Sequence, residues 1–448
     1  MTTEFAMKDK LVGENPSPNP SNAPSKTVWI INQHTATPHT TNGHFRHYYL
    51  AREFKRKGYK VCLIIGSYSH LSKRKEQPSK QFTFELVDDI HICTVKVPKY
   101  GIGRSVGRIF NLIVFCLKLF FLPNNKLPKP DYILVSSMPL FPILNGYRLK
   151  KRFKNCKLIF EIRDIWPLTI IELGQFSAQH PFVRLLAAIE KFGYRKADYI
   201  TSVLPHTDAH IAGTIKKPFK FRHIPNGIDL ESYEEQSVPL NAETLAGIPK
   251  DKFIVGYAGT LGHANAMEFF VEAARKVEQH EDIAFVLVGE GYLKADLQDA
   301  AKGLSNIHFL NAIPKHQMPA LLQRFDLCFL GWRASKLYHF GVSANKIYDY
   351  MYSGRPIVMV GDIRSNEISK TGCGVTLAYD DADALAKQIV EFCRMSRHER
   401  HEIGRKGKDY VLKNNTYQKL SERYMEIFTE LTASAKGVAS EMLMAKDK

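Results

Sequence analysis

The sequence lacks the cysteine patterns of disulfide-rich and zinc-binding proteins. Its 448 residues include seven cysteines, and no two of them form a Cys-x-x-Cys pair. Most lie within apolar runs, where a free thiol behaves as a small hydrophobic side chain. A disulfide framework and a zinc site are therefore not expected, and the expected compartment is the cytoplasm.

Long apolar segments are also missing. No uninterrupted apolar run reaches the roughly 18–20 residues that span a bilayer, and residues 1–26 contain no apolar signal-peptide core. This first segment is rich in Pro, Ser and Asn, a composition typical of a disordered arm. We therefore expect a disordered arm over 1–26 and no membrane-spanning helix.

Acidic residues are scarce in one half of the chain only. Residues 1–220 hold 34 Lys and Arg against 15 Asp and Glu, whereas residues 221–448 hold 28 against 30. A basic half beside a neutral half implies an anionic partner for one domain, such as nucleic acid, anionic lipid or a phosphorylated substrate. Nucleic acid is not expected, because the basic residues form no recognisable recognition motif.

The length favours two domains, and the pattern of elements restarts midway. Short apolar strands alternate with helical segments in each half, an arrangement that predicts parallel sheets. The expected strands are 27–32, 61–65, 131–135, 157–161 and 198–203, then 253–257, 284–288, 307–310, 327–330, 357–360 and 375–377.

These elements predict domains at 27–215 and 251–415, a linker over 216–250, and a C-terminal helix and tail over 416–448. Apolar residues recur at helical spacing after Asn415. We interpret that apolar face as a cover for the sheet of its own domain.

Two glycine-bearing turns follow strands of the second half. Open parallel sheets bind ligands at the carboxyl ends of their strands, and glycine lets the backbone approach a diphosphate. Ordinary tight turns are the alternative interpretation. Neither half begins with Gly-x-Gly-x-x-Gly, which disfavours a nicotinamide dehydrogenase. The candidate diphosphate contacts are Gly259, Thr260, Gly262, Gly289 and Gly291.

The segment 340–360, FGVSANKIYDYMYSGRPIVMV, resembles the retaining, sugar-nucleotide-dependent glycosyltransferases of family 4. The resemblance implies the GT-B fold, with two Rossmann-like, doubly wound α/β domains facing a central cleft. In that fold the C-terminal domain binds the nucleotide-sugar donor, which we expect to be a UDP-sugar. The residues that match the family's motif are Asn345, Lys346, Asp349, Tyr350, Met351, Gly354 and Pro356.

The resemblance assigns roles to several of these positions. Asp349 stands where a family carboxylate accepts bonds from the donor ribose, while Gly341 replaces the other carboxylate of the pair. Asn345 lies beside the donor. The segment NIHFLNAIPKHQMPALL resembles the base-binding loop and places Ala312 and Ile313 at the nucleobase.

Lys346 is the candidate for stabilising the leaving diphosphate. The family commonly uses an Arg and a Lys after the first turn of this domain, but the segment GTLGHANAMEFF has neither. A Lys is a point charge suited to phosphate, so Lys346 is our catalytic candidate on the donor side. A surface lysine without such a role is the alternative.

The first half has a His- and Thr-rich loop, NQHTATPHTTNGHFRHYY, at 32–49. By resemblance, Gly43 faces the donor diphosphate and His44 contacts the acceptor. The histidine spacing matches no zinc motif and lacks carboxylate partners. We therefore expect no metal and no cofactor beyond the donor.

The segment EIRDIWP begins at Glu161 and follows a strand directly. It resembles a signature of the polysaccharide-forming branch, whose members transfer aminosugars in O-antigen and capsule synthesis. Glu161 and Arg163 are candidate acceptor contacts, and Asp164 is a catalytic candidate. A structural ion-pair network is the alternative for these charged groups.

The apolar stretch Ile109–Leu122 is flanked by basic residues and is too short to span a bilayer. This composition fits a helix lying in a membrane interface, with contact through about 104–126. A buried core helix is the alternative. The basic residues are Arg104, Arg108, Lys118 and Lys126.

Together these observations predict a retaining glycosyltransferase that moves a sugar onto a glycan or lipid-linked acceptor. We expect it in the cytoplasm, peripheral on the inner face of the plasma membrane. Two alternatives stay open: a sugar-nucleotide 2-epimerase of the same fold, and a non-catalytic, membrane-associated GT-B subunit of a polysaccharide complex.

Overall fold

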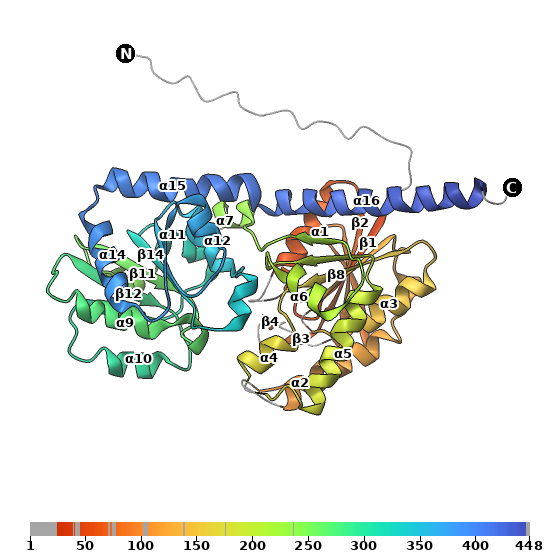
Figure 1. Cartoon of the computed structure of the whole chain (residues 1–448), viewed down its shortest axis with the longest axis horizontal. Coiled ribbons are helices and arrows are strands. Elements are labelled where there is room, and N and C mark those ends of the chain that lie inside the picture. The colour runs from red at the N-terminus through yellow and green to blue at the C-terminus, as the bar shows by residue number, and fades with distance from the viewer. Residues whose placement is uncertain are drawn as a thin grey trace, which may run out of the picture.

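The computed structural model describes residues 25–444 apart from 39, 41–44, 70–71, 74–77, 102–105, 138, 175 and 236. Two sheets lie beside each other along the long axis of the molecule (Figure 1). Each sheet carries a hydrophobic cluster on both faces, which is the layering expected of doubly wound domains.

The N-terminal sheet has eight strands in the order β10-β9-β8-β7-β1-β2-β6-β5. All neighbours are parallel except β5, which pairs antiparallel with β6 at one edge. The strands are β1 (Thr27–Ile31), β2 (Lys60–Gly66), β5 (Phe82–Val87), β6 (Ile90–Val95), β7 (Tyr132–Ser136), β8 (Lys157–Ile162), β9 (Tyr199–Ser202) and β10 (Phe221–His223).

The C-terminal sheet has six parallel strands in the order β13-β12-β11-β14-β15-β16. The chain order reverses between β11 and β14, and doubly wound sheets open a ligand crevice at such a switch point. The strands are β11 (Phe253–Ala258), β12 (Ile283–Val288), β13 (Ile307–Leu310), β14 (Leu327–Gly331), β15 (Ile357–Val360) and β16 (Gly374–Leu377).

Helices cover both sheets, and two short ones lie in the connection between them. The N-terminal helices are α1 (Arg46–Arg56), α2 (Val106–Leu119), α3 (Pro142–Arg152), α4 (Leu168–Glu172), α5 (Pro181–Lys196) and α6 (Thr207–Thr214). The connection holds α7 (Leu230–Glu234) and α8 (Ala242–Ala246). The C-terminal domain has α9 (Met267–Lys276), α10 (Lys294–Ala300), α11 (Met318–Leu322), α12 (Asn345–Tyr352), α13 (Glu367–Thr371), α14 (Ala382–Arg394) and α15 (Arg397–Asn414).

The last helix, α16 (Tyr417–Met444), crosses back to the N-terminal domain (Figure 1). Tyr424 and Phe428 pack against Phe54 of α1, with ring centroids 5.7 and 5.5 Å apart, and Phe428 stacks on Tyr132 at 4.2 Å. The interpretation that this helix covers the sheet of its own domain is therefore wrong. Its apolar face packs on the N-terminal domain, against α1 and β7.

The two predicted Rossmann-like sheets are confirmed. The pair β5 and β6 was not predicted, and β10 extends the first sheet beyond the expected boundary at 215. No helix in the described part of the chain is both long and apolar enough to cross a membrane.

Candidate functional site

Two neighbouring pockets lie between the domains, and each is lined by residues of both. We call them the Asp349 pocket, of about 520 Å³, and the Asp164 pocket, of about 490 Å³. Asn345, the first residue of α12, lines both. The start of α12 therefore stands between a space near the expected ribose position and a space near the expected acceptor side.

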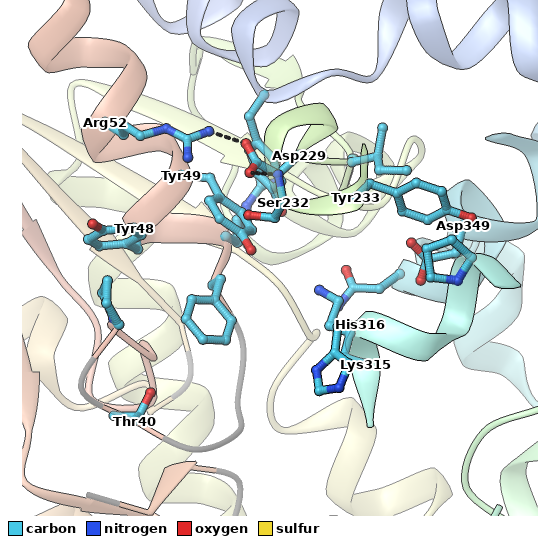
Figure 2. A pocket seen from close by; sticks show the side chains of 18 of the residues that line it. Thr40, Tyr48, Tyr49, Arg52, Asp229, Ser232, Tyr233, Lys315, His316 and Asp349 are labelled. Carbon is cyan, nitrogen blue, oxygen red and sulfur yellow. Dashed lines mark hydrogen bonds and ion pairs between the residues drawn. The ribbon is translucent and has the colours of Figure 1, made fainter. Parts of the chain in front are cut away.

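The Asp349 pocket brings the base-side loop of the C-terminal domain opposite α1. Asp349, Lys315 and His316 lie on one side, and Tyr48 and Tyr49 lie across from them (Figure 2). Burial raises the pKa of Asp349, and the nearby charge of Lys315 opposes this. The half-buried Asp349 carboxylate is thus available at the wall of a cleft, where a hydroxyl-rich ligand can bond it.

Lys346 lies beside the first glycine turn of the C-terminal domain. Its Nζ donates to Asn265 Oδ1 at 2.6 Å and to Tyr257 Oη at 3.0 Å, and it stands 4.7 Å from the centre of the Tyr257 ring. Among the described residues no carboxylate pairs with it, and burial lowers its pKa to about 7. A cation held this way gains most from an anionic ligand.

Lys346 itself does not line either pocket, but neighbouring residues line both of them. Its Nζ is 6.0 Å from the ring centre of Trp332, which lines the Asp164 pocket. Asn345 precedes it on α12, and no side chain caps this helix at Ala344. The free N–H groups and positive end of α12 are therefore presented beside Lys346, as anion sites require.

The glycine-bearing turns that follow β11 and β12 are hydrogen-bonded to each other. The N–H groups of Gly259, Leu261 and Gly289 donate to backbone carbonyls at 2.9, 2.9 and 3.2 Å. The N–H groups of two expected diphosphate contacts, Gly259 and Gly289, are therefore engaged within the protein. The Thr260 and Gly262 N–H groups have no acceptor among the described residues and stay candidates.

Glycine is required in the second turn by close packing. A β-carbon at Gly289 would lie 1.9 Å from the carbonyl oxygen of Gly259, and one at Gly291 would lie 2.0 Å from that of Leu261. Either contact is far inside van der Waals distance. These two glycines therefore serve to dock one turn against the other, and so to shape the site.

The expected base-binding loop follows β13. Lys294 Nζ bonds Glu290 Oε1 at 2.7 Å and Asn311 Oδ1 at 3.0 Å, which ties the second glycine turn to the start of this loop. Ala312 is exposed and Ile313 is half-buried. The following residues, from Pro314, line the Asp349 pocket.

The Asp164 pocket contains the charged residues that follow β8. Burial raises the pKa of Asp164, and Arg163 opposes this. Burial together with the charge of Asp164 raises the pKa of Tyr338, across the cleft, to about 12. Arg163 Nε is buried without a hydrogen-bond partner among the described residues. The pocket thus offers a carboxylate and an unused cationic donor to a polar ligand.

Glu161 takes a different place from its two neighbours. It is fully buried, and its carboxylate accepts bonds from Arg46 at 2.9 and 3.0 Å, His47 at 2.6 Å and Tyr424 at 2.7 Å. Burial alone would raise its pKa, but Arg46 and His47 outweigh this and hold the pKa well below its usual value. The expected contact between Glu161 and an acceptor has no support in this arrangement.

The ion-pair cluster around Glu161 also holds the interdomain connection. Arg46 donates to the carbonyls of Ile224 at 2.9 Å and Pro225 at 2.6 Å. Asn226, next along the chain, donates its backbone N–H to Ser343 Oγ of the C-terminal domain at 2.9 Å. The alternative of a structural network therefore applies to Glu161, while Arg163 and Asp164 face the cleft.

Two expected residues, Gly43 and His44, lie outside the described residues. Of the loop histidines that are described, His47 bonds Glu161 and Thr35 Oγ1. Within the described residues, no three His, Cys, Asp or Glu side chains are grouped so that they could hold a metal ion.

Sequence reasoning missed the contacts that position Lys346. Tyr257 lies at the end of β11, Asn265 follows the first glycine turn, and Trp332 follows β14. A strand-end aromatic beside a glycine turn was the available signal for Tyr257. Nothing local in the sequence connects Trp332 to Lys346, because sheet pairing alone brings β14 beside β11.

Two family models match the chain, one in each half. Residues 43–232 match the model described as Glycosyltransferase Family 4. Residues 252–394 match the model described as Glycosyl transferases group 1. The first match covers the N-terminal sheet apart from β1, and the second covers most of the C-terminal domain.

Among curated proteins, the chain is similar to one from Escherichia coli K12 that is named as a colanic acid biosynthesis glycosyl transferase, WcaI. The two are 24% identical over 245 residues, which is 52% of this chain and 58% of that protein. The match thus spans less than two thirds of that relative's length.

Solved structures show the same fold across nearly the whole chain. Sucrose-phosphate synthase from Thermosynechococcus elongatus has a TM-score of 0.67 at 17% identity, covering 91% of this chain and 100% of that one. The trehalose-6-phosphate protein of E. coli bound with UDP-2-fluoro glucose has 0.68 at 12%, covering 91% and 99%. Anabaena HepE in complex with UDP and glucose has 0.60 at 13%, covering 90% and 100%.

The matches agree with the two Rossmann-like sheets. The chain has the GT-B fold, with a glycosyltransferase family 4 domain in its N-terminal half and a glycosyl transferases group 1 domain in its C-terminal half.

Proposed function

We propose that this protein is a retaining glycosyltransferase that moves a sugar from a UDP-sugar onto a polysaccharide or lipid-linked acceptor in cell-surface glycan synthesis. The donor lies along the C-terminal side of the cleft. Asp349 bonds the ribose, Ala312 and Ile313 contact the base, and Lys346 with the start of α12 stabilises the diphosphate.

The environment of the Lys346 side chain is the main support for this proposal. It is a half-buried cation without a carboxylate partner among the described residues, and it stands at the carboxyl end of β11 beside an uncapped helix start. Fixed positive groups aimed at developing negative charge lower the barrier to departure of a leaving group. The departing UDP diphosphate is such a group.

The acceptor side of the proposal rests on the Asp164 pocket. Asp164 and Arg163 lie across the cleft from Tyr338 and beside Asn345, so a hydroxyl placed there is close to the donor side. In the proposed reaction, the bond between sugar C1 and the diphosphate oxygen breaks, and the acceptor oxygen bonds C1 on the same face. The acceptor proton passes to the departing phosphate oxygen.

The relatives support this choice of substrates. HepE and the trehalose-6-phosphate protein were solved with UDP, UDP-glucose or a fluorinated UDP-glucose. The similar E. coli protein is named as a glycosyl transferase of colanic acid biosynthesis. A UDP-sugar is therefore the first donor to test.

The test is thermal unfolding of the full chain with a panel of UDP-, GDP- and dTDP-sugars. A ligand at 100 times its Kd stabilises the folded state by about 2.7 kcal/mol. One UDP-sugar should therefore raise the unfolding midpoint of the wild type and of the control Lys302→Ala, whose side chain is exposed. Lys346→Ala should not respond.

Failure of every nucleotide-sugar to shift the midpoint would contradict the proposal and favour the non-catalytic alternative. Asp164→Asn should keep the shift and lose transfer to an acceptor glycan. Conversion of the nucleotide-sugar to its 2-epimer without any acceptor would replace the transferase proposal with the epimerase.

A further inference from the structure

Helix α2 has two apolar faces, and only one of them is buried. Leu112, Phe115, Cys116 and Leu119 pack into the core of the N-terminal domain. A second set, which we call the exposed α2 face, is open to solvent. It consists of Ile109, Phe110, Ile113 and Leu117, with Phe121 just after the helix, and these side chains are 36–79% exposed.

The exposed α2 face is continuous. At about 100° per residue, its four helical members fall within roughly 100° of arc, on a face centred about 120° away from the centre of the buried set. Large apolar side chains gathered on one face of a soluble domain mark an interaction surface. The alternative of a buried core helix therefore describes the face of α2 that carries Phe115 and Leu119, but not the exposed α2 face.

The surrounding charge has one sign only. Residues 90–130 contain seven Lys and Arg and no Asp or Glu. Lys99, Lys126 and Lys129 are exposed. A second copy of this chain would bring the same cations together, which disfavours self-association through this face. Nucleic acid would match the charge but leave the apolar side chains without a partner.

We propose that the exposed α2 face docks the N-terminal domain on an anionic lipid bilayer. Ile109, Phe110, Leu117 and Phe121 enter the acyl boundary, and the neighbouring lysines contact the lipid phosphates. A helix with this distribution lies in the plane of the interface, and each nearby cation adds to binding on an anionic surface.

Docking at α2 leaves the crossing helix α16 free, because the two lie at opposite ends of the N-terminal domain (Figure 1). It also places one wall of the Asp164 pocket toward the membrane. Ile170 of α4 packs on the same hydrophobic cluster as Phe115 of α2, while Thr169 and Leu173 line that pocket. That this placement brings a lipid-linked acceptor to the pocket rests on the proposed function. The docking of the domain on a bilayer does not rest on it.

The test is sedimentation of the full chain with vesicles of phosphatidylcholine alone or with about 30 mol% phosphatidylglycerol. The wild type should bind the anionic vesicles more tightly. Phe110→Ser combined with Phe121→Ser should weaken that binding about tenfold or more, since two large apolar side chains no longer enter the bilayer. Leu86→Ser, at a side chain 60% exposed on β5, is the control and should bind as the wild type does.

Charge is tested separately. Lys126→Gln combined with Lys129→Gln should weaken binding to anionic vesicles and reduce its dependence on salt. All variants change exposed side chains, so an unchanged unfolding midpoint verifies their folding.

Three results would overturn the proposal. The wild type could fail to bind anionic vesicles, or the double phenylalanine variant could bind as tightly as the wild type. Sedimentation velocity could also show a dimer that this variant dissociates, which would assign the exposed α2 face to a second copy.

Discussion

Protonation of Lys346 should be coupled to donor binding. Burial lowers its pKa to about 7, so at pH 7.5 only about a quarter of the free protein carries the charge. A diphosphate beside Nζ stabilises the charged form and raises the pKa. Binding of UDP-glucose must then be accompanied by uptake of a proton.

The expected size follows from these fractions. Uptake should be about 0.7 proton per bound UDP-glucose at pH 7.5 and about 0.1 at pH 6. Lys346 is a base whose pKa is lower in the free protein than in the complex. Affinity is therefore highest below pH 7 and should fall up to about tenfold per pH unit above about pH 7.5.

Titration calorimetry in buffers of different ionisation enthalpy, from pH 6 to 8.5, measures both quantities. UDP-glucose is preferred over UDP because it has no terminal phosphate with a pKa of about 6. Lys346→Arg should bind without the pH slope, since arginine stays charged. Wild-type binding without proton uptake, or a pH slope that persists in Lys346→Arg, would show that protonation of Lys346 is not coupled to donor binding.

Three further changes probe the site and its support. Lys346→Met should raise the unfolding midpoint of the unliganded protein by about 1–3 °C at pH 7. The reason is that the Lys346 side chain binds a proton less well in the folded protein than in the unfolded chain, between pH 7 and 10.5. The increase in unfolding midpoint should therefore disappear above pH 10.5. Glu161→Gln should lower the free energy of unfolding by about 3–5 kcal/mol in a denaturant titration, because Arg46 is left buried without its partner, whereas Glu402→Gln at an exposed ion pair should leave the transition unchanged. Gly289→Ala should lower the unfolding midpoint, since its β-carbon would overlap a carbonyl oxygen, while Gly213→Ala, which meets nothing within 4 Å, should not.

The two sheets could be predicted because their strands are buried on both faces and read as short apolar runs between turns. The partner of α16 could not. Its apolar spacing, through Tyr417, Leu420 and Tyr424, defines a face that either domain could cover. Only the direction in which the chain leaves α15 decides that it packs on α1.

The site was predictable where one segment carries several of its residues. Asn345, Lys346 and Asp349 lie on one short helix, so the motif also placed them together in space. Residues at and just after the end of β8 were harder to assign. Successive side chains leave a strand on opposite faces, and the sequence alone does not tell that Glu161 points inward to Arg46 while Asp164 faces the cleft.

Hydrogen exchange of the full chain with and without UDP, GDP and dTDP tests whether the C-terminal side of the cleft binds the nucleotide. One nucleotide should slow exchange in peptides covering 258–265, 310–317 and 343–350. Lys346→Ala should lose this protection. Protection confined to the N-terminal domain, or none with any nucleotide, would contradict the claim that the C-terminal side of the cleft holds the donor.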